Sequence, residues 1–255
     1  MTARWRSEWP VFLLAVQFLT RLPVPKDLPF SDELLIRATR YYPLVGLVVG
    51  AIGAVVLAFA SLGLPWPVAV LLSMAATIFA TGAFHEDGLA DAADGLGGGM
   101  TRERALEIMR DSRIGTYGMV TLGLVLALKA AVLMSFAPAF AAVAVIVAHG
   151  ASRMVPVYVV ARHEYAREVG AKFVAPTVSP GGFRVATMTT AVILLVGAAV
   201  LGPVAVLVGI GIALLASWVF RAMFLRKLQG YTGDCLGALQ QLSELGFYLG
   251  LALWL

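Results

Sequence analysis

The residues whose types can do chemistry gather in one stretch, HEDGLADAADG, between His85 and Gly95. Its three aspartates, Asp87, Asp91 and Asp94, follow directly after an apolar segment. On an α-helix their spacing brings the carboxylates into an arc of about 60° on one face. Ionised groups this close repel one another, and they are costly beside hydrocarbon. The pattern therefore indicates a site for a cation or a polar ligand.

The ligand chemistry of this face favours a hard divalent cation. Carboxylate oxygens suit Mg²⁺, which keeps several of its waters and is commonly shared with substrate phosphates. Zinc instead prefers His or Cys, and His85 is the only such residue in the stretch. The alternative is a soluble helix end with solvated acids, followed by a flexible glycine-rich linker at 95–99. The spacing favours the cation site over this alternative.

A second charged segment, Thr101–Gly115, is expected to form an amphipathic cytoplasmic helix. Its first residue suits the N-cap position, and Glu107 and Asp111 lie one turn apart on the same face. Arg110 and Arg113 flank Asp111. A charged helix resting on the membrane surface explains most of this pattern. The alternative is a phosphate-binding role, because a planar guanidinium matches phosphate oxygens bidentately.

A third constellation combines acids and bases at membrane depth. Asp234 opens the last apolar segment, where it can cap a helix or act in the site, and Glu244 follows deeper inside. A buried carboxylate needs a partner and by default marks a functional site. Arg153 can pair with Glu244, bind a substrate phosphate or extend to the interface. Lys129 lies nearer the opposite surface, and we expect its amine to reach the water there.

These charges stand out because the chain is strongly apolar, with 60% hydrophobic residues, 13% charged residues and a mean hydropathy of +0.88. Such values predict an all-α polytopic membrane protein. The single cysteine, Cys235, excludes an intramolecular disulfide framework and a cysteine-based zinc site. A crossing of the hydrocarbon core takes roughly twenty helical residues. About seven segments qualify, near 41–62, 65–84, 116–136, 139–160, 185–201, 203–220 and 235–255.

The loops predict which side of the membrane carries the chemistry. The turns between the first and second, third and fourth, and fifth and sixth segments contain no Lys, Arg, Asp or Glu. The remaining loops carry the arginines and lysines, so the positive-inside rule places them in the cytoplasm together with the acidic face. The net charge of +4 therefore reflects topology and does not indicate nucleic acid as a partner.

Residues 1–40 precede the first expected span. The apolar run Pro10–Leu19 is too short to cross a bilayer, and no signal-peptide cleavage site follows it. We interpret it as a helix lying in the cytoplasmic interface of the lipid bilayer. No repeat or linker divides the chain, so residues 1–255 are expected to form a single membrane-embedded catalytic domain. The sequence leaves a homo-oligomer open.

Several strings, in order along nearly the whole chain, resemble one family. HEDGLADAADG, EIMRDSRIGTYG and GYTGD are similar to motifs of the cobalamin synthases, the adenosylcobinamide-GDP ribazoletransferases. The strings FLTRLP at 18–23, YPLVG at 42–46 and Ser152-Arg153 also resemble family segments. The chain departs from the pattern at Glu86, where an apolar residue is more usual, and before the GYTGD string, where more glycine is expected.

The resemblance implies a Mg²⁺-dependent integral membrane enzyme that acts late in cobalamin biosynthesis. Such an enzyme joins α-ribazole, or its 5′-phosphate, to adenosylcobinamide-GDP and releases GMP, on the cytoplasmic side of the bacterial inner membrane. In that reaction Asp87, Asp91 and Asp94 would hold the metal, directly or through water. The negative charge that builds on the diphosphate would be met by metal and arginine.

The same resemblance suggests roles for the other polar residues. The proton of the attacking hydroxyl would pass to His85, Asp111 or Asp234, and the sequence does not choose among them. Contacts to the substrate phosphate or nucleotide would come from four further residues, Arg110, Arg113, Arg153 and Glu244.

Two other functions fit parts of the pattern. A CDP-alcohol phosphotransferase also arranges aspartates at helical spacing around metal, but the string Asp-Gly-x-x-Ala-Arg expected there is absent after Asp87. A cation transporter would line a path with intramembrane acids. The acids here cluster at one face of the membrane instead, and no inverted repeat or matched pair of broken helices is evident.

Overall fold

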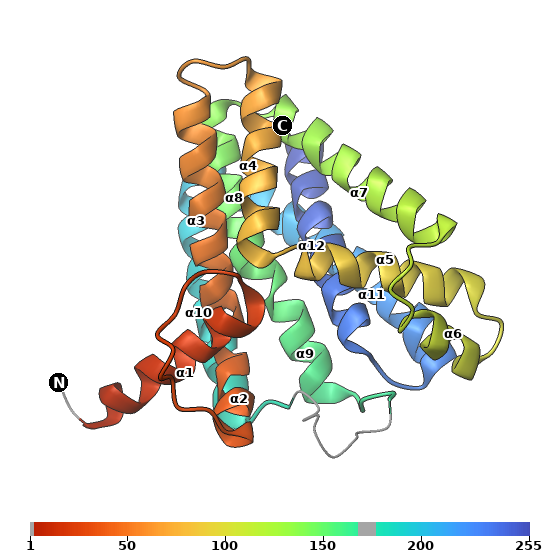
Figure 1. Ribbon diagram of the computed structural model, residues 1–255. Helices are drawn as coiled ribbons and strands as arrows, with labels where there is room; N and C mark the ends of the chain where they lie inside the picture. Colours follow the sequence, from red (N-terminus) through yellow and green to blue (C-terminus); the bar gives the residue numbers. More distant parts are fainter. Residues whose placement is uncertain (1–2, 168–176) are drawn as a thin grey trace.

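The computed structural model describes residues 3–167 and 177–255, and this part of the chain is built from helices (Figure 1). It contains no β-strand within those ranges, only an isolated bridge between Tyr165 and Tyr231. The expected all-α class is thereby confirmed. The helices are α1 (Ala3–Leu19), α2 (Asp32–Ala38), the 3-10 turn η1 (Thr39–Tyr41), α3 (Tyr42–Ala60), α4 (Trp66–Thr81), α5 (Phe84–Gly98), α6 (Arg102–Ile108), α7 (Thr116–Ser135), α8 (Pro138–Ser152), α9 (Met154–Arg162), α10 (Pro180–Leu201), α11 (Pro203–Leu228) and α12 (Gly233–Trp254).

Fewer helices are long and apolar enough to span a membrane than the seven segments expected from the sequence. In the described chain, five are long and apolar enough, namely α2 with α3, α7, α8 with α9, α10, and α11. Helix α4 passes only jointly with α5, and the two are bent by 86°. Helix α12 falls outside the set because glutamines and acids interrupt its apolar residues. Since α5 runs across the bundle (Figure 1), we place it outside the spanning helices.

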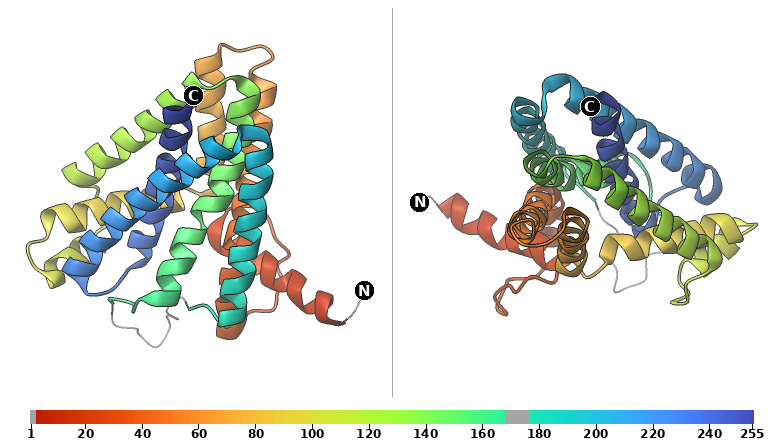
Figure 2. Two further views of the ribbon diagram at one scale, coloured as in Figure 1. Left: turned by 180° about the vertical axis from the view of Figure 1, so that it is seen from behind. Right: turned by 90° about the horizontal axis from the view of Figure 1, so that it is seen from above.

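Helix α12 lies at the centre of the bundle, as the view from above shows (Figure 2). It contacts α5, α7, α8, α9 and α11, and most of its side chains are buried. Polar residues at membrane depth are expected to face the bundle interior, where other helices supply partners. Helix α12, which carries polar residues among its apolar ones, is therefore the helix that the others surround.

Small residues set how closely the spanning helices approach. The sequence places Gly46 and Gly50 one turn apart on α3, a spacing that predicts close helix packing. A Cβ atom at Gly46 would collide with the carbonyl of His149 on α8, and one at Gly50 would lie 2.8 Å from the Cα of Ile146. The expected close packing on a neighbouring helix is confirmed, and the structure identifies that neighbour as α8.

Helix α1 lies across the lower end of the bundle and does not run parallel to it (Figure 1). Its buried side chains, among them Val11, Leu14 and Leu19, pack on the first turns of α3, while Trp9 is exposed. Glu8 fixes the helix to the following segment, since its carboxylate accepts a hydrogen bond from Tyr41 Oη at 2.7 Å. This arrangement agrees with an interfacial position.

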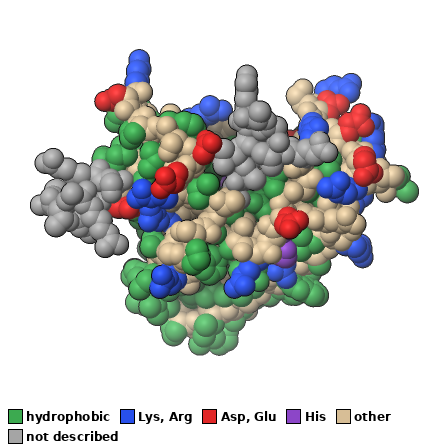
Figure 3. Space-filling model, turned by 90° about the horizontal axis from the view of Figure 1, so that it is seen from below, with side chains coloured by type: hydrophobic (Ala, Val, Ile, Leu, Met, Phe, Trp, Pro, Cys, Tyr) green, Lys and Arg blue, Asp and Glu red, His purple; other side chains and the backbone are tan. Residues whose placement is uncertain are grey.

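The two ends of the bundle differ in charge, as the sequence predicted. The turns from α3 to α4 and from α7 to α8 lie at one end, whereas α1, α2 and the loop after α9 lie at the other (Figure 1). Seen from below, the second end displays Lys, Arg, Asp and Glu side chains in several groups (Figure 3). This charged end is the one that the positive-inside rule assigns to the cytoplasm.

Candidate active site

A sharp corner between α4 and α5 brings the acidic face out of the bundle axis. Gly82 and Ala83 both adopt left-handed backbone angles, with φ of 65° and 58°. A Cβ at Gly82 would lie 2.6 Å from the Nε atom of Arg21, so this position needs glycine for conformation and for space. The backbone N–H of Arg21 donates to the carbonyl of Ala80 at 2.7 Å, which ties the end of α1 to the corner. The chain therefore turns from a span into α5 at a fixed place.

Asp94 stabilises the start of α7. Its carboxylate accepts hydrogen bonds from the backbone N–H groups of Gly115 (2.7 Å) and Gly118 (2.8 Å), and it is buried. A Cβ at either glycine would collide with this carboxylate, which explains both glycines in the GTYG string. Both carboxylate oxygens of Asp94 are thus engaged. The metal-binding role predicted for it stays a prediction, and these contacts compete with it.

Asp87 and Asp91 remain open on the same helix. Burial raises the pKa of the Asp91 carboxyl to about 7, and the neighbouring carboxylates of Asp87, Asp234 and Asp94 add to the effect. Neither Asp87 nor Asp91 forms an ion pair with any described residue. The positive charge of Arg167 lowers the pKa of Asp91, but Arg167 is itself paired with Asp234. Like charges held together with so little compensation favour the binding of a cation.

Asp234 joins this face from the first turn of α12. Close packing brings the two helices together, since a Cβ at Gly88 would lie 3.1 Å from the carbonyl oxygen of Asp234. The helix cap is Thr232, whose hydroxyl accepts from the Cys235 N–H at 3.2 Å, so the capping role considered for Asp234 is wrong. Asp234 instead pairs with Arg167, with 2.5 Å between Nη2 and Oδ2.

The donor atoms here are all carboxylate oxygens, which fits Mg²⁺ chemically. No group of three or more His, Cys, Asp or Glu side chains converges as metal ligands within residues 3–167 and 177–255. The fit therefore depends on Asp87 and Asp91, with further oxygens from a bound substrate. Mg²⁺ commonly binds through one or two carboxylates plus substrate phosphates, so the residues present suffice for that mode.

A cavity of about 250 Å³ opens beside these acids. His85, at the start of α5, and Arg153, at the break between α8 and α9, line it together with Arg167. Arg153 is only 2% exposed, and one of its Nη atoms donates to the carbonyl of His149 at 2.6 Å. Its Nε atom is buried and has no hydrogen-bond partner in the described chain. Two guanidinium groups and an imidazole thus face one space.

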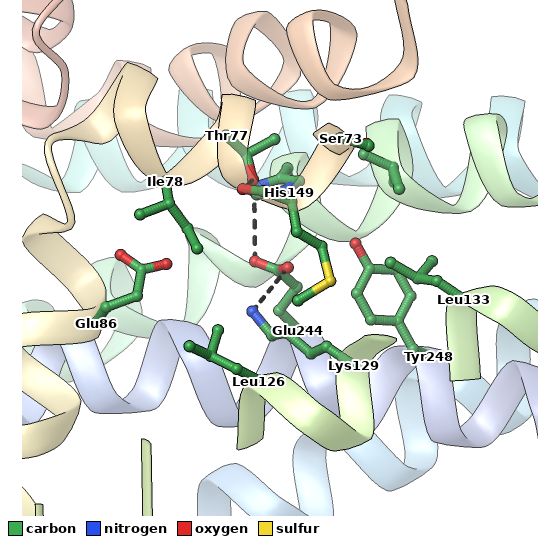
Figure 4. A pocket seen from close by; sticks show the side chains of 12 residues that line it. Ser73, Thr77, Ile78, Glu86, Leu126, Lys129, Leu133, His149, Glu244 and Tyr248 are labelled. Carbon is green, nitrogen blue, oxygen red and sulfur yellow. Dashed lines mark hydrogen bonds and ion pairs between the residues drawn. The ribbon is translucent and has the colours of Figure 1, made fainter. Parts of the chain in front are cut away.

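A separate polar network lies deeper, between α5, α7, α8 and α12 (Figure 4). Lys129 donates to Glu244 at 2.9 Å and to Gln241 at 2.6 Å, and Glu244 also accepts from Gln240 at 2.6 Å. Lys129 is buried, so the expectation that it reaches the opposite surface is wrong. The amine finds a carboxylate inside the bundle, which stabilises it more than a long extension to water. Glu244 has its partners within this network, and its predicted substrate contact stays a prediction.

The Thr101–Gly115 segment forms a shorter helix than expected. Thr101 is its N-cap, as predicted, but α6 ends at Ile108. Asp111 therefore lies in the following loop, and the expected shared face with Glu107 is wrong. Asp111 pairs with Arg113 at 2.6 Å. This pairing lowers the pKa of the exposed Asp111 carboxyl to about 2, which makes it a weak base.

The structure brings together only some of the predicted site residues. Asp87, Asp91 and Asp234 form one acidic group, and His85 and Arg153 line the cavity beside it. Asp111, Arg110 and Arg113 belong to the loop after α6 and do not line that cavity. Their predicted roles in catalysis and phosphate binding stay predictions.

Sequence reasoning missed Arg167, which lines the cavity and pairs with Asp234. It is one of several arginines in a charged loop, and nothing in its spacing distinguishes it from the others. Arg102 was also missed as a structural residue. Its guanidinium donates to the carbonyls of Leu228 (2.8 Å) and Ala166 (2.7 Å), which connects the start of α6 to the end of α11 and to the segment that follows α9.

Fold and site together define a multi-pass membrane protein in which two arginines line a cavity next to a group of acids. Residues 11–252 match the model of the family described as Cobalamin-5-phosphate synthase. Three relatives are named adenosylcobinamide-GDP ribazoletransferase. The chain is 42% identical to that of Vibrio vulnificus (strain YJ016) over 252 residues, which is 96% of both chains. It is 45% identical to that of Ralstonia nicotianae over 255 residues, or 98% of this chain and 93% of the relative.

The third relative, from Leptothrix cholodnii, is 45% identical over 252 residues, which is 95% of both chains. No solved structure matches the chain. The protein belongs to the cobalamin-5-phosphate synthase family and acts in the last steps of cobalamin biosynthesis. The resemblance inferred from its motifs is confirmed, and the comparisons support neither the lipid phosphotransferase nor the transporter.

Proposed function

We propose that this chain transfers the cobinamide phosphate of adenosylcobinamide-GDP to a free ribose hydroxyl of α-ribazole, or of its 5′-phosphate, in which the 5′-oxygen is already esterified. The hydroxyl oxygen attacks the phosphorus attached to cobinamide and forms a new P–O bond. The P–O bond to the GMP phosphate breaks, GMP leaves, and the hydroxyl proton is lost to a base. The product is adenosylcobalamin or its 5′-phosphate.

The observation that carries this proposal is the convergence of Arg153 and Arg167 on one cavity beside Asp87 and Asp91. A diphosphate gains charge on its leaving phosphate during the reaction, and guanidinium groups stabilise that charge. Arg153 is held in place by its bond to the His149 carbonyl and keeps an unpaired Nε for a ligand oxygen. Its geometry is therefore set before the substrate binds.

Two residues are placed to accept the hydroxyl proton. His85 lines the cavity, and Asp234 borders it through its pair with Arg167. Asp111 is the weaker candidate, because its ion pair with Arg113 lowers the pKa of its carboxyl to about 2 and because it does not line the cavity. A general base must lie within hydrogen-bond reach of the proton that it takes.

Asp87 and Asp91 would hold Mg²⁺ in this proposal. The bound ion would supply positive charge against the diphosphate oxygens. The two carboxylates are one turn apart on α5, and the close packing of Gly88 against α12 keeps this face beside Asp234. The chain thus fixes the position of the acidic face through backbone contacts.

We place the site on the cytoplasmic side of the bacterial inner membrane. The acidic face, the cavity and the basic loops share one end of the bundle, and the positive-inside rule assigns that end to the cytoplasm. A lipid bilayer would surround α3, α7, α10 and α11, whose outward side chains are mostly large and apolar.

The test is product analysis with the purified full-length protein. It is incubated in detergent or vesicles with adenosylcobinamide-GDP, α-ribazole and MgCl₂, and the products are separated by chromatography. We expect adenosylcobalamin and GMP in equal amounts, with no cobalamin when α-ribazole is omitted. Release of GMP without a cobalamin product, or turnover of CDP-diacylglycerol under the same conditions, would contradict the proposal.

A further inference from the structure

The cavity beside the acidic face has two chemically different halves. One half carries His85, Arg153 and Arg167, and the other is walled by aromatic and aliphatic side chains. The apolar half draws on α1, α3, α5, α9 and α12, which are spread along the sequence, and its aromatic residues are Phe18, Tyr42 and Phe84. Tyr165 also lines the cavity, and its hydroxyl bonds to Arg167 of the polar half. A phosphate-binding site alone does not require this second half.

The rings of the apolar half form a continuous run that ends at the polar half. Phe18 stacks on Tyr42 with 6.0 Å between ring centroids and 13° between ring planes. Phe84 meets Phe18 edge-on at 5.6 Å, and Phe84 meets His85 edge-on at 5.4 Å. A flat ligand lying along this run would therefore reach from Tyr42 toward His85.

Phe18 and Phe84 leave much of their ring surface uncovered, with 41% and 44% of each residue exposed. Both also line the cavity, so part of this uncovered surface faces a space that a ligand can fill. Aromatic rings gain most from stacking against another flat ring, and offset or edge-on arrangements are both favourable. The uncovered rings thus favour an aromatic ligand.

The chemistry of the apolar wall selects among aromatic ligands. Leu19, Pro156 and Leu236 complete the wall and present no hydrogen-bonding side chain, and the one hydroxyl in the wall, that of Tyr42, is already bonded to Thr39. Guanine has donors and acceptors around its edge, and these would lose water without gaining partners against such a wall. A base with no polar edge loses nothing there. The wall therefore fits an apolar bicyclic base better than the guanine of the donor.

We propose that the Phe18, Tyr42 and Phe84 wall binds the apolar base of the acceptor nucleoside, with the ribose directed toward His85 and the arginines. This inference rests on the proposed function, in which the acceptor is α-ribazole, a nucleoside of dimethylbenzimidazole. Stacking of the base on the wall positions the attacking ribose hydroxyl at the polar half. The donor diphosphate then lies on Arg153 and Arg167, and its guanine lies outside the apolar half.

The test compares the KM values of the two substrates in ring-deleted variants. Phe18→Leu and Phe84→Leu keep apolar volume but remove the stacking surface. We expect each to raise the KM for α-ribazole about 10-fold, because base stacking on an aromatic side chain is commonly worth 5- to 100-fold. The KM for adenosylcobinamide-GDP should stay within about twofold. Phe84→Tyr, which keeps the ring, should stay near the wild type for both substrates.

Phe59→Leu is the matched control. Phe59 is a large exposed aromatic residue at the far end of α3, beside the uncharged turn, and it does not line the cavity. Its substitution should leave both KM values unchanged. Thermal unfolding of each variant shows whether it is folded, and titration calorimetry with α-ribazole alone measures acceptor binding even in a variant that has lost turnover.

The outcomes separate this inference from the proposed function. A wild-type enzyme that forms no cobalamin overturns the function, and calorimetry with α-ribazole then still tests the wall. A rise in the donor KM alone would place guanine or the corrinoid on the wall and overturn the inference. Unchanged acceptor KM and affinity in both leucine variants would assign the rings to lipid contact and overturn it as well.

Discussion

Two polar regions meet at α5: the interior network around Glu244, where the charges are paired, and the acidic face, where they are not. Glu86 points into the bundle and accepts a hydrogen bond from Gln241 at 2.9 Å, at the edge of the network around Glu244 and Lys129. Asp87, the next residue, is exposed on the acidic face. Two adjacent residues of α5 thus place one carboxyl group among hydrogen-bond partners inside the bundle and the other on a surface where it has no ion pair with any described residue.

The difference teaches which charges are structural. Inside the bundle Glu244 has Lys129, Gln240 and His149 as partners, because an unpaired charge away from water is strongly destabilising. On the acidic face Asp91 lies near other carboxylates, an arrangement that weakens the fold unless something binds there. Unfavourable electrostatics that persist in a folded protein indicate function.

The largest expected effect comes from breaking the interior network. Glu244→Gln leaves the buried Lys129 without its counter-charge and should lower the free energy of unfolding by about 3–5 kcal/mol. Thermal unfolding in detergent checks this. The double variant Lys129→Met with Glu244→Leu should recover much of the loss, since it removes both charges. Equal stability of wild type and the single variant would show that the pair is not structural.

On the acidic face the expected loss is in activity. Asp87→Asn and Asp91→Asn should each lower kcat/KM by about 100-fold, because removal of a group that stabilises transition-state charge commonly costs this much. Stability should not fall, since each substitution relieves repulsion. Glu107→Gln, an exposed acid on α6, is the control and should behave as wild type. Normal activity of Asp91→Asn over a Mg²⁺ titration would remove Asp91 from the metal site.

A smaller effect is expected at Asp94, which separates structural from metal-binding acids. Asp94→Ala removes two hydrogen bonds to the start of α7 and should lower stability by about 1–2 kcal/mol. Asp94→Asn keeps one acceptor oxygen and should lose less. The Mg²⁺ concentration for half-maximal activity is measured for both. A shift as large as that of Asp91→Asn would give Asp94 the metal role predicted from sequence.

The smallest effect concerns pH. Because the pKa of Asp91 is raised to about 7 in the folded protein from an unfolded value near 4, the folded state binds the extra proton between these limits. Its contribution to stability therefore falls as the pH rises from about 4 to 7. The melting temperature without Mg²⁺ should decline over this range more in wild type than in Asp91→Asn. If the melting temperature fell equally with pH in the wild type and in Asp91→Asn, the raised pKa of Asp91 would be contradicted.

Much of the fold was predictable from local pattern. Long apolar segments can only become helices in a bilayer, and the distribution of Lys and Arg between loops predicts orientation. The Gly46 and Gly50 spacing correctly predicted close packing on a neighbour. The number of spans was less predictable, because α12 carries its polar residues inside the bundle and α4 ends in a corner at Gly82.

The candidate site was predictable in part, for a related reason. The aspartates of HEDGLADAADG share one helix, so their face follows from helical geometry. Lys129 and Glu244 come from different helices, and the hydrogen bonds between them depend on tertiary packing. Arg167 belongs to a loop, where no periodicity links it to Asp234. Sequence reasoning therefore found the acids and missed their partner.

By itself the sequence determined that this protein is a helical membrane protein of the cobalamin synthase family with a group of aspartates on one helical face. These properties follow from hydropathy, charge and motif strings, which are local along the chain. Only the tertiary structure decided that Asp94 accepts hydrogen bonds from the start of α7 and that Lys129 forms an ion pair with Glu244 inside the bundle. It also decided that aromatic residues of α1, α3 and α5 share a cavity with Arg153. Contacts between distant helices depend on how their side chains fit in space, and a one-dimensional pattern does not contain that fit.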